Sequence, residues 1–139
     1  MPIGRPLRSS CSDLLLLFGL DLDQLAGCLI LVEGAFDRLA LLAAGFQTTE
    51  VVALVGTSLQ VDWFPYQVKS VVLALDSDEG GLDATRRLAE CLARAGLCVS
   101  ICPPLQDGWG KDWSERWRRI GYQSLRPIYE IYTELARPA

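Results

Sequence analysis

Four runs of apolar residues recur along the chain, each only five or six residues long. Runs of this length suit buried strands better than helices, which need more residues to cover a core. Because the runs are nearly continuous rather than alternating, we expect strands covered on both faces, as in a parallel sheet. The predicted strands are Cys28 to Val32, Val51 to Val55, Val71 to Leu75 and Leu97 to Cys102.

Helical patterns separate these strands. After the first strand, small and apolar residues between Phe36 and Ala44 recur at the spacing of one helix face, and Gly45 supplies a stop. Further helices are predicted from near Leu59 to Pro65, from Leu82 to Ala95, from Trp113 to Ile120 and from Leu125 to Leu135. Alternation of strands and helices predicts right-handed crossovers. The expected fold is therefore α/β, a Rossmann-like, mostly parallel four-stranded sheet flanked by helices.

The 139 residues suffice for one compact domain with a single core. Residues 1–26 hold a lead-in rich in Pro, Gly and Ser, followed by short predicted helices. We expect the α/β domain over residues 27–120 and a C-terminal helix over residues 121–139. The apolar run from Leu14 to Phe18 is far too short to span a bilayer, so we expect no membrane association.

Composition narrows the chemistry that the chain can perform. The net charge of -4 disfavours nucleic acid as a partner unless metal ions, a local cationic patch or another protein holds it. The chain has no histidine, which excludes histidine metal sites and Ser-His-Asp triads. Its five cysteines form no CxxC pair, so they indicate neither a zinc ribbon nor a disulfide framework. A reducing, cytoplasmic location suits them.

Acidic residues stand at the ends of two predicted strands. Glu33 follows the first strand, Asp76 follows the third, and Asp78 comes two residues later. Ligands of open parallel sheets bind outside the carboxyl ends of the strands, so these carboxylates converge if the two strands are neighbours. Converging carboxylates repel one another unless protons or cations neutralise them. Oxygen ligands favour Mg²⁺ or Mn²⁺ over zinc, and we therefore predict a divalent-metal site at this edge.

Simpler roles are open to several candidate residues. Asp76 and Asp78 can cap the helix that follows them, although capping accounts for one aspartate and not for both together with the glutamate of the first strand. Lys111 is either a phosphate contact or an ordinary exposed lysine. Arg86 and Arg87 either reach a nucleic-acid backbone or lie on a solvent-exposed helix face.

Four motifs resemble, in order and spacing, those of the Toprim domain shared by topoisomerases, bacterial DnaG-type primases, small ribonucleases and OLD-type nucleases. They read LVEGAFD, LVGTSL, LALDSDEGG and GKDWSE and span about residues 27–120. Each motif is common by itself, and the ordered set carries the resemblance. The similarity is closest to the primase branch, in which the third motif reads DxDxxG before a helix. Ser77 stands where primases often have glycine, and Trp113 stands where they usually have proline.

The resemblance implies roles for the acidic residues. Glu33 matches a glutamate that acts as metal ligand or general acid/base, and Asp76 and Asp78 match the metal-binding DxD pair. These three residues would carry catalysis. Asp37 and Asp112 match two further acidic positions and are candidate outer members of the metal site. Asp37 can instead cap a helix or pair with Arg38 or Arg86, and Asp112 can instead cap the helix that begins at Trp113.

The resemblance also implies a function. We expect Mg²⁺- or Mn²⁺-dependent phosphoryl or nucleotidyl transfer on nucleic acid by a primase-like protein. Nucleic acid and nucleotides would be its partners, together with a partner protein or additional domain, such as a helicase or a zinc-binding module, because the acidic chain lacks a broad basic surface. Two alternatives stay open. One is a Toprim nuclease that hydrolyses DNA or RNA, and the other is a non-catalytic interaction module whose Trp113 and Trp117 face binds a partner.

Overall fold

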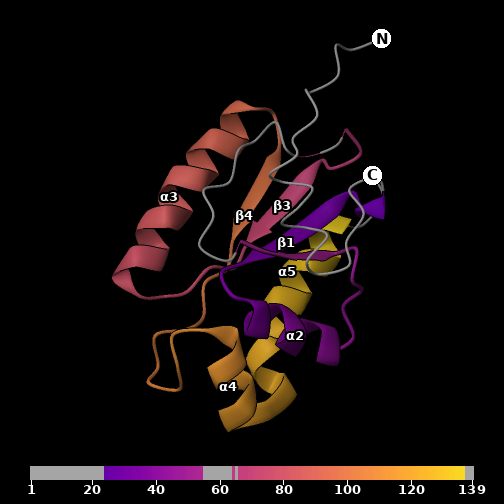
Figure 1. Cartoon of the computed structure of the whole chain (residues 1–139). Helices are drawn as coiled ribbons and strands as arrows, with labels where there is room; N and C mark the ends of the chain where they lie inside the picture. Colours follow the sequence, from indigo (N-terminus) through magenta and orange to yellow (C-terminus); the bar gives the residue numbers. More distant parts are fainter. Residues whose placement is uncertain (1–23, 55–63, 65, 137–139) are drawn as a thin grey trace.

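The computed structural model describes residues 24–54, 64 and 66–136, and Figure 1 shows its elements. The strands are β1 (Cys28–Val32), β2 (Val51–Ala53), β3 (Ser70–Leu73) and β4 (Cys98–Ile101). The helices are α2 (Ala35–Ala43), α3 (Glu79–Arg94), α4 (Trp113–Ile120), the 3-10 helix η3 (Gly121–Leu125) and α5 (Arg126–Ala136). None of the helices within the described ranges is long and apolar enough to cross a bilayer. The helices predicted before Gln24 and near Leu59 lie outside the described residues.

The four strands pair in parallel in the order β2-β1-β3-β4. Leu31 of β1 is the register partner of Val52 on one side and of Leu73 on the other. The predicted α/β fold with a four-stranded parallel sheet is therefore confirmed. β1 and β3, whose ends carry the predicted acidic residues, are direct neighbours, so the condition for those residues to converge is met.

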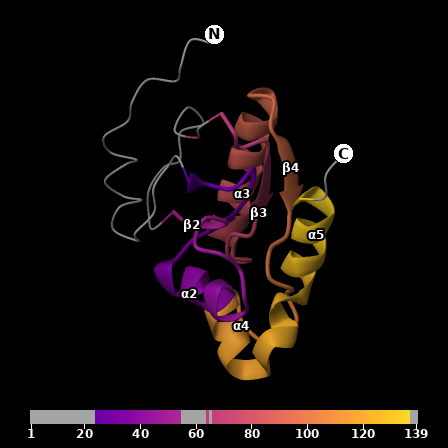
Figure 2. The same ribbon diagram turned by 90° about the vertical axis from the view of Figure 1, so that its right-hand side faces the viewer.

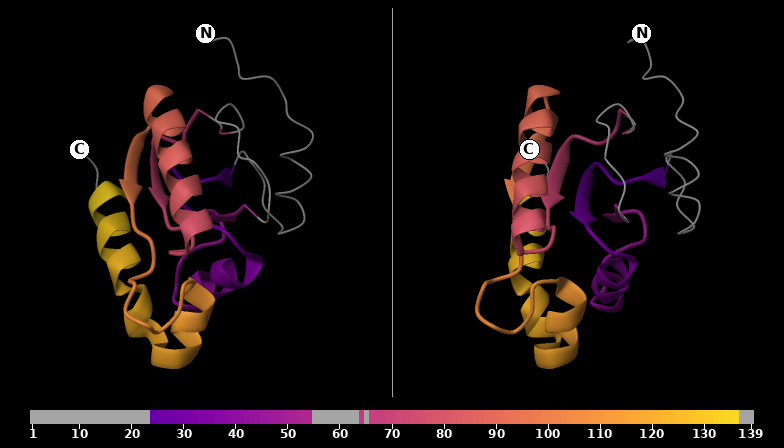
Figure 3. Two further views of the ribbon diagram at one scale, coloured as in Figure 1. Left: turned by 90° about the vertical axis from the view of Figure 1, so that its left-hand side faces the viewer. Right: turned by 60° about the vertical axis from the view of Figure 1, so that its left-hand side comes forward.

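Helices cover both faces of the sheet, because the strands are apolar on both. Leu31 packs in a core cluster that includes Leu92 of α3. Ile30, which points to the opposite face, packs in a second cluster with Trp113 of α4 and Ile128 of α5. Figures 2 and 3 show α3 and α5 on opposite sides of the sheet. The three layers hold the carboxyl ends of the strands in fixed relative positions.

The helices differ from the sequence prediction chiefly at the start of α3 and between α4 and α5, and elsewhere by about one residue. Helix α3 begins at Glu79 rather than at Leu82, because Asp78 acts as its N-cap and accepts a hydrogen bond from the backbone N–H of Gly81 at 2.7 Å. The glycine pair that was expected to precede the helix therefore forms part of its first turn. The 3-10 helix η3 was not predicted, and α5 begins directly after it at Arg126.

Trp113 is a core residue rather than part of an exposed partner-binding face. Its side chain is 1% exposed, and its Nε1 donates a hydrogen bond to the carbonyl oxygen of Ala74 at 2.9 Å. Trp117, one turn farther along α4, is half-buried and contacts the ring of Tyr122 edge-on, with 6.0 Å between the ring centroids. Trp113 thus ties α4 to the segment that leads from β3 to Asp76.

Candidate metal centre

Three carboxylates converge at the carboxyl ends of β1 and β3. Glu33 directly follows β1, while Asp76 and Asp78 lie in the segment that joins β3 to α3. One carboxylate oxygen of each residue lies within 4.8 Å of the other two. The backbone N–H of Asp76 also donates a hydrogen bond to Oε1 of Glu33 at 3.3 Å. We refer to these residues as the acidic triad, and they are the three that the sequence analysis placed together.

Asp76 is the most buried member of the acidic triad, at 9% exposed. Its Oδ1 is buried and makes no hydrogen bond within the described residues. Burial raises the pKa of this carboxyl first, and the surrounding negative charges, with Glu33 foremost, raise it further, from 3.8 to about 8. A carboxyl in this environment is stabilised by a proton or by a bound cation.

The negative charge of Asp78 is stabilised by two neighbouring groups. Its Oδ1 accepts the helix-capping hydrogen bond from Gly81, and its Oδ2 lies 3.1 Å from the Nζ of Lys111. These two contacts, the Gly81 bond first, lower the pKa of Asp78, and the contact with Asp78 raises the pKa of Lys111. Asp78 is therefore ionised at neutral pH, and the structure places the ammonium of Lys111 directly at the acidic triad.

Asp37 lies next to the acidic triad but is held by other partners. Its side chain is buried, Oδ2 accepts a hydrogen bond from the backbone N–H of Gly34 at 3.1 Å, and Oδ1 accepts one from the backbone N–H of Ser114 at 3.0 Å. Burial is the largest cause that raises the pKa of Asp37. Asp37 thus joins the start of α2 to the start of α4, at a position where its charge also raises the pKa of Asp76.

Asp112 has a capping role in the structure. Its Oδ1 accepts hydrogen bonds from the backbone N–H of Glu115 at 2.8 Å and from the hydroxyl of Ser114 at 3.0 Å, which makes it the N-cap of α4. Among the described residues, the close carboxylate group consists of the acidic triad without Asp37 or Asp112. Asp112 nevertheless contributes to the raised pKa of Asp76, so it lies close enough to act on the site electrostatically.

Arg86 and Arg87 lie on the exposed surface of α3. Their guanidinium groups are 3.6 Å and 3.3 Å from the carboxylate oxygens of Asp83, and both side chains are more than 70% exposed. Exposed pairs of this kind contribute little to stability, so the arginines can exchange this partner for another anion at small cost. They are available on the helix that begins at the acidic triad.

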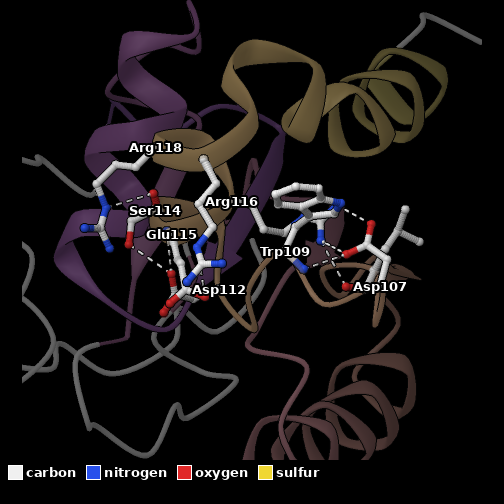
Figure 4. A network of polar contacts seen from close by, with 9 residues as sticks. Asp107, Trp109, Asp112, Ser114, Glu115, Arg116 and Arg118 are labelled. Atoms are coloured by element: carbon white, nitrogen blue, oxygen red, sulfur yellow. Dashed lines mark hydrogen bonds and ion pairs between the residues drawn. The ribbon is translucent and has the colours of Figure 1, made fainter.

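The loop from β4 to α4 is attached to the segment between Asp76 and Asp78 by contacts that could not be predicted from the sequence. The backbone N–H of Ser77 donates to the carbonyl oxygen of Lys111 at 2.8 Å, and Nε2 of Gln106 donates to the carbonyl oxygen of Ser77 at 2.9 Å. On the other side of the loop, the guanidinium of Arg116 donates to both carboxylate oxygens of Asp107, at 2.5 and 3.1 Å. Figure 4 shows Arg116 and Asp107 together with the polar contacts of Asp112 at the start of α4. These contacts join positions at least nine residues apart, so no helix or strand periodicity predicts them.

The acidic triad fits a hard divalent cation. All three side chains offer carboxylate oxygens, the ligand type that Mg²⁺ and Mn²⁺ prefer. The buried Oδ1 of Asp76 is an open ligand position, and a cation there would relieve the repulsion that raises the pKa of this residue. Both oxygens of Asp78 have partners, so its participation as a ligand requires Lys111 to move away.

Comparisons with known proteins agree with the fold and with the motifs. Residues 30–117 match a family described as Toprim-like. Over 104 residues the chain is 38% identical to the DNA primase of Mycoplasma pneumoniae, and this similarity covers 70% of the chain and 16% of that primase.

Solved structures that are similar to the chain include the following two. One is the Aquifex aeolicus primase, in a structure of its zinc-binding and RNA polymerase domains, with a TM-score of 0.57, 31% identity and coverage of 76% of this chain and 26% of that one. The other is the DnaG catalytic core, with a TM-score of 0.56, 27% identity and coverage of 81% of this chain and 35% of that one. The chain therefore spans between 16% and 35% of the lengths of these relatives.

Proposed function

The chain belongs to the Toprim-like family, close to its primase branch, and on this premise we propose that it performs Mg²⁺-dependent nucleotidyl transfer on nucleic acid as the catalytic module of a primase-like protein. The observation that carries the proposal is the convergence of Glu33, Asp76 and Asp78 within 4.8 Å, with the Oδ1 of Asp76 buried and unpartnered within the described residues. Three carboxylates held this close destabilise the fold unless protons or a cation compensate them, so their convergence supports a metal-binding role.

We propose Glu33, Asp76 and Asp78 as direct ligands of Mg²⁺ or Mn²⁺. A bound divalent ion supplies polarisation of a phosphate group and neutralisation of charge during phosphoryl transfer. Glu33 accepts a long hydrogen bond of 3.3 Å from the N–H of Asp76, which leaves it well placed to exchange a proton with the substrate. Asp37 and Asp112 act from outside the acidic triad, because their negative charges favour a cation beside Asp76.

Lys111 is the proposed contact for a substrate phosphate. Its ammonium lies 3.1 Å from Oδ2 of Asp78. When Asp78 becomes a metal ligand, Lys111 loses this partner and its charge becomes available to a phosphate oxygen at the same edge of the sheet. Arg86 and Arg87 are proposed contacts for the nucleic-acid backbone farther along α3, reached by exchanging Asp83 for phosphate.

Binding of template and nucleotides is proposed to depend on a further domain or a partner protein. The chain carries a net charge of -4, which opposes the approach of a polyanion. The Aquifex primase structure, of which the chain covers 26%, includes zinc-binding and RNA polymerase domains. We propose that comparable parts, in a longer chain or in a partner, supply the cationic surface.

Calorimetric titration of the metal-free chain with Mg²⁺ and Mn²⁺ tests the metal site. The wild-type chain is expected to bind with saturation, and the Asp76→Asn variant is expected to lose binding while its circular dichroism spectrum stays unchanged. Asp83→Asn, which removes an exposed carboxylate elsewhere on α3, is the matched control and should bind as the wild type does. Equal affinity in the Asp76→Asn variant and in the wild type would remove the proposed site.

Incubation with labelled single-stranded DNA or RNA, Mg²⁺ and nucleotides then separates the possible reactions. The assay is run with and without the zinc-binding module of a bacterial primase. Nucleotide-dependent synthesis of new strands that Glu33→Gln abolishes supports nucleotidyl transfer. Shortening of the labelled strand that Glu33→Gln abolishes identifies a nuclease instead, and contradicts the proposal.

A further inference from the structure

Arg116 is a charged residue that the fold removes almost completely from solvent. Its side chain is 3% exposed, and its guanidinium donates hydrogen bonds to both carboxylate oxygens of Asp107 and to the carbonyl oxygen of Leu105, the last at 3.1 Å. Its Nε has no partner within the described residues. Well-packed apolar residues often stabilise a fold as well as a buried ion pair does. The buried pair of Arg116 and Asp107 is therefore better explained by a role in positioning the loop between β4 and α4 than by a gain in stability alone.

The residues that Arg116 holds belong to one loop, which runs from Pro103 to Asp112 between β4 and α4. The opposite side of this loop is fastened to the DxD segment. Gln106 donates to the carbonyl oxygen of Ser77 at 2.9 Å, and the N–H and hydroxyl of Ser77 donate to the carbonyl oxygen of Lys111 at 2.8 and 3.3 Å. The loop thus spans the distance between the guanidinium on α4 and the acidic triad.

The last residue of the loop before the N-cap of α4 is Lys111, whose ammonium lies 3.1 Å from Oδ2 of Asp78. The Lys111 side chain is 59% exposed, so surrounding side chains do little to direct it. An exposed pair loses side-chain entropy when it forms and gains little in return. How often this pair forms therefore depends on where the backbone of Lys111 is held.

We infer that Arg116 and Asp107 form a clamp that holds Lys111 against Asp78, so that the ammonium of this lysine occupies a cation position of the acidic triad. Arg116 and Asp107 are positioning residues, because they act on the site through the loop. The inference deepens the proposed function and rests on it in one respect: Lys111 then competes with a divalent metal for Asp78. The clamp itself is independent of metal.

Lysine-directed chemistry tests the clamp without metal, because Lys69 and Lys111 are the only lysines in the chain. A carbodiimide activates a carboxylate, and a lysine amine in contact with it displaces the reagent as a urea and forms an amide, so mass spectrometry of the linked peptides reports the contact. We expect a Lys111–Asp78 link in the wild type, and a yield at least about threefold lower in Asp107→Asn. A lysine-specific protease should cut after Lys111 at least about threefold faster in that variant, while cleavage after Lys69 stays constant as an internal reference.

Asp107→Asn is the primary variant because Asp107 is 38% exposed and asparagine has nearly the same size, so the change weakens the ion pair without opening a cavity. Arg116→Gln is the second variant, because it removes the guanidinium without adding a third lysine to the chain. Glu90→Gln is the control, because it removes an ion pair of comparable length, 2.7 Å to Arg94, on α3. Unchanged link yield and unchanged cleavage after Lys111 in both clamp variants would overturn the inference.

Measurement of Mg²⁺ affinity distinguishes a failure of this inference from a failure of the proposed function. We expect Asp107→Asn to bind Mg²⁺ about twofold more tightly than the wild type, and to show no such difference when both proteins also carry Lys111→Gln. A purely structural role would change Mg²⁺ affinity equally in both backgrounds, and that result would overturn the positioning role. If the wild type binds no Mg²⁺, the proposed function fails, whereas a changed link yield and cleavage rate still support the clamp.

Discussion

Gly81 lies so close to Asp76 that a Cβ atom at position 81 would stand 2.1 Å from the carbonyl oxygen of Asp76. The same Cβ would stand 2.9 Å from Oε1 of Glu33. Separations below 3.0 Å are essentially never seen for real Cβ atoms, and one of the two opposing groups is rigid backbone. The first turn of α3 can therefore approach the acidic triad only because residue 81 has no side chain.

Replacement of this glycine should disrupt the site and the fold together. We expect Gly81→Ala to lower the free energy of unfolding by roughly 1–3 kcal/mol or more, because overpacking against backbone forces α3 away from β3. Urea unfolding measures the loss. Gly80→Ala is the matched control: its Cβ would meet its nearest atom, Oδ1 of Asp78, at 3.9 Å, an ordinary contact. The control should be neutral or stabilised by about 0.4–1 kcal/mol. Equal effects at the two positions would contradict the close approach.

The raised pKa of Asp76 predicts a pH dependence of stability in the absence of metal. Its pKa in the folded chain is about 8, against 3.8 without the fold, so the folded state keeps a proton that the unfolded state has lost. Stability is then greatest below about pH 4, as far as this group is concerned, and falls as the pH rises towards 8, by at most about 1.4 kcal/mol per pH unit. Asp37, whose pKa is also raised, acts in the same direction.

Asp76→Asn tests the origin of this slope. We expect the variant to be more stable than the metal-free wild type at pH 8 and to lose less stability between pH 5 and pH 8, as measured by thermal unfolding at each pH. Added Mg²⁺ should raise the unfolding temperature of the wild type at pH 8 and leave that of the variant unchanged. An unaltered slope in Asp76→Asn would show that other groups cause it.

The strands and the acidic triad could be predicted from sequence for a simple physical reason. Glu33 and Asp76 follow continuous apolar runs, and a parallel sheet brings the carboxyl ends of its strands to one edge. The predicted start of α3 was wrong because a glycine pair disfavours a helix locally. In the structure Asp78 caps the helix, and the carbonyl oxygen of Asp76 leaves no space for a Cβ atom at position 81. In this case the capping hydrogen bond outweighs the low helix propensity of the glycine pair.

Contacts between distant segments could not be predicted from sequence. Asp37 and Ser114 are 77 positions apart, and nothing near either residue specifies the other. Arg116 reads as one of several arginines on an amphipathic helix, and only the packing of α4 shows that this arginine is buried while Arg118 and Arg119 are exposed. The charged groups and hydrogen bonds around the acidic triad can therefore be identified only from the structure.

The hydrogen bonds of Asp37 predict a structural rather than a ligand role. Asp37→Asn keeps an acceptor for one of the two backbone N–H groups but turns an amide N–H towards the other. We expect a loss of about 1–3 kcal/mol in the free energy of unfolding, with Mg²⁺ binding retained. Chemical unfolding and calorimetric titration measure the two effects. A folded Asp37→Asn protein that binds no Mg²⁺ would make Asp37 a direct ligand.

Arg86 and Arg87 should affect affinity for nucleic acid through charge alone. Each phosphate contact removed lowers the dependence of log affinity on log salt concentration by about 0.7–0.9. Binding of labelled DNA or RNA in Mg²⁺ at several salt concentrations should therefore show a slope reduced by up to about 1.8 in the Arg86→Gln, Arg87→Gln double variant. Arg126→Gln, on α5 across the sheet, is the control. Slopes that match the control would leave the two arginines as ordinary surface residues.

A crystal of the protein soaked in Mn²⁺ tests the metal site most directly. Anomalous scattering locates Mn²⁺ without reference to the shape of the density. The predicted result is a peak in contact with carboxylate oxygens of Glu33, Asp76 and Asp78, including the buried Oδ1 of Asp76, with Lys111 displaced from Asp78. No peak at the acidic triad at millimolar Mn²⁺, with Lys111 still paired to Asp78, would contradict metal-dependent catalysis at this edge of the sheet.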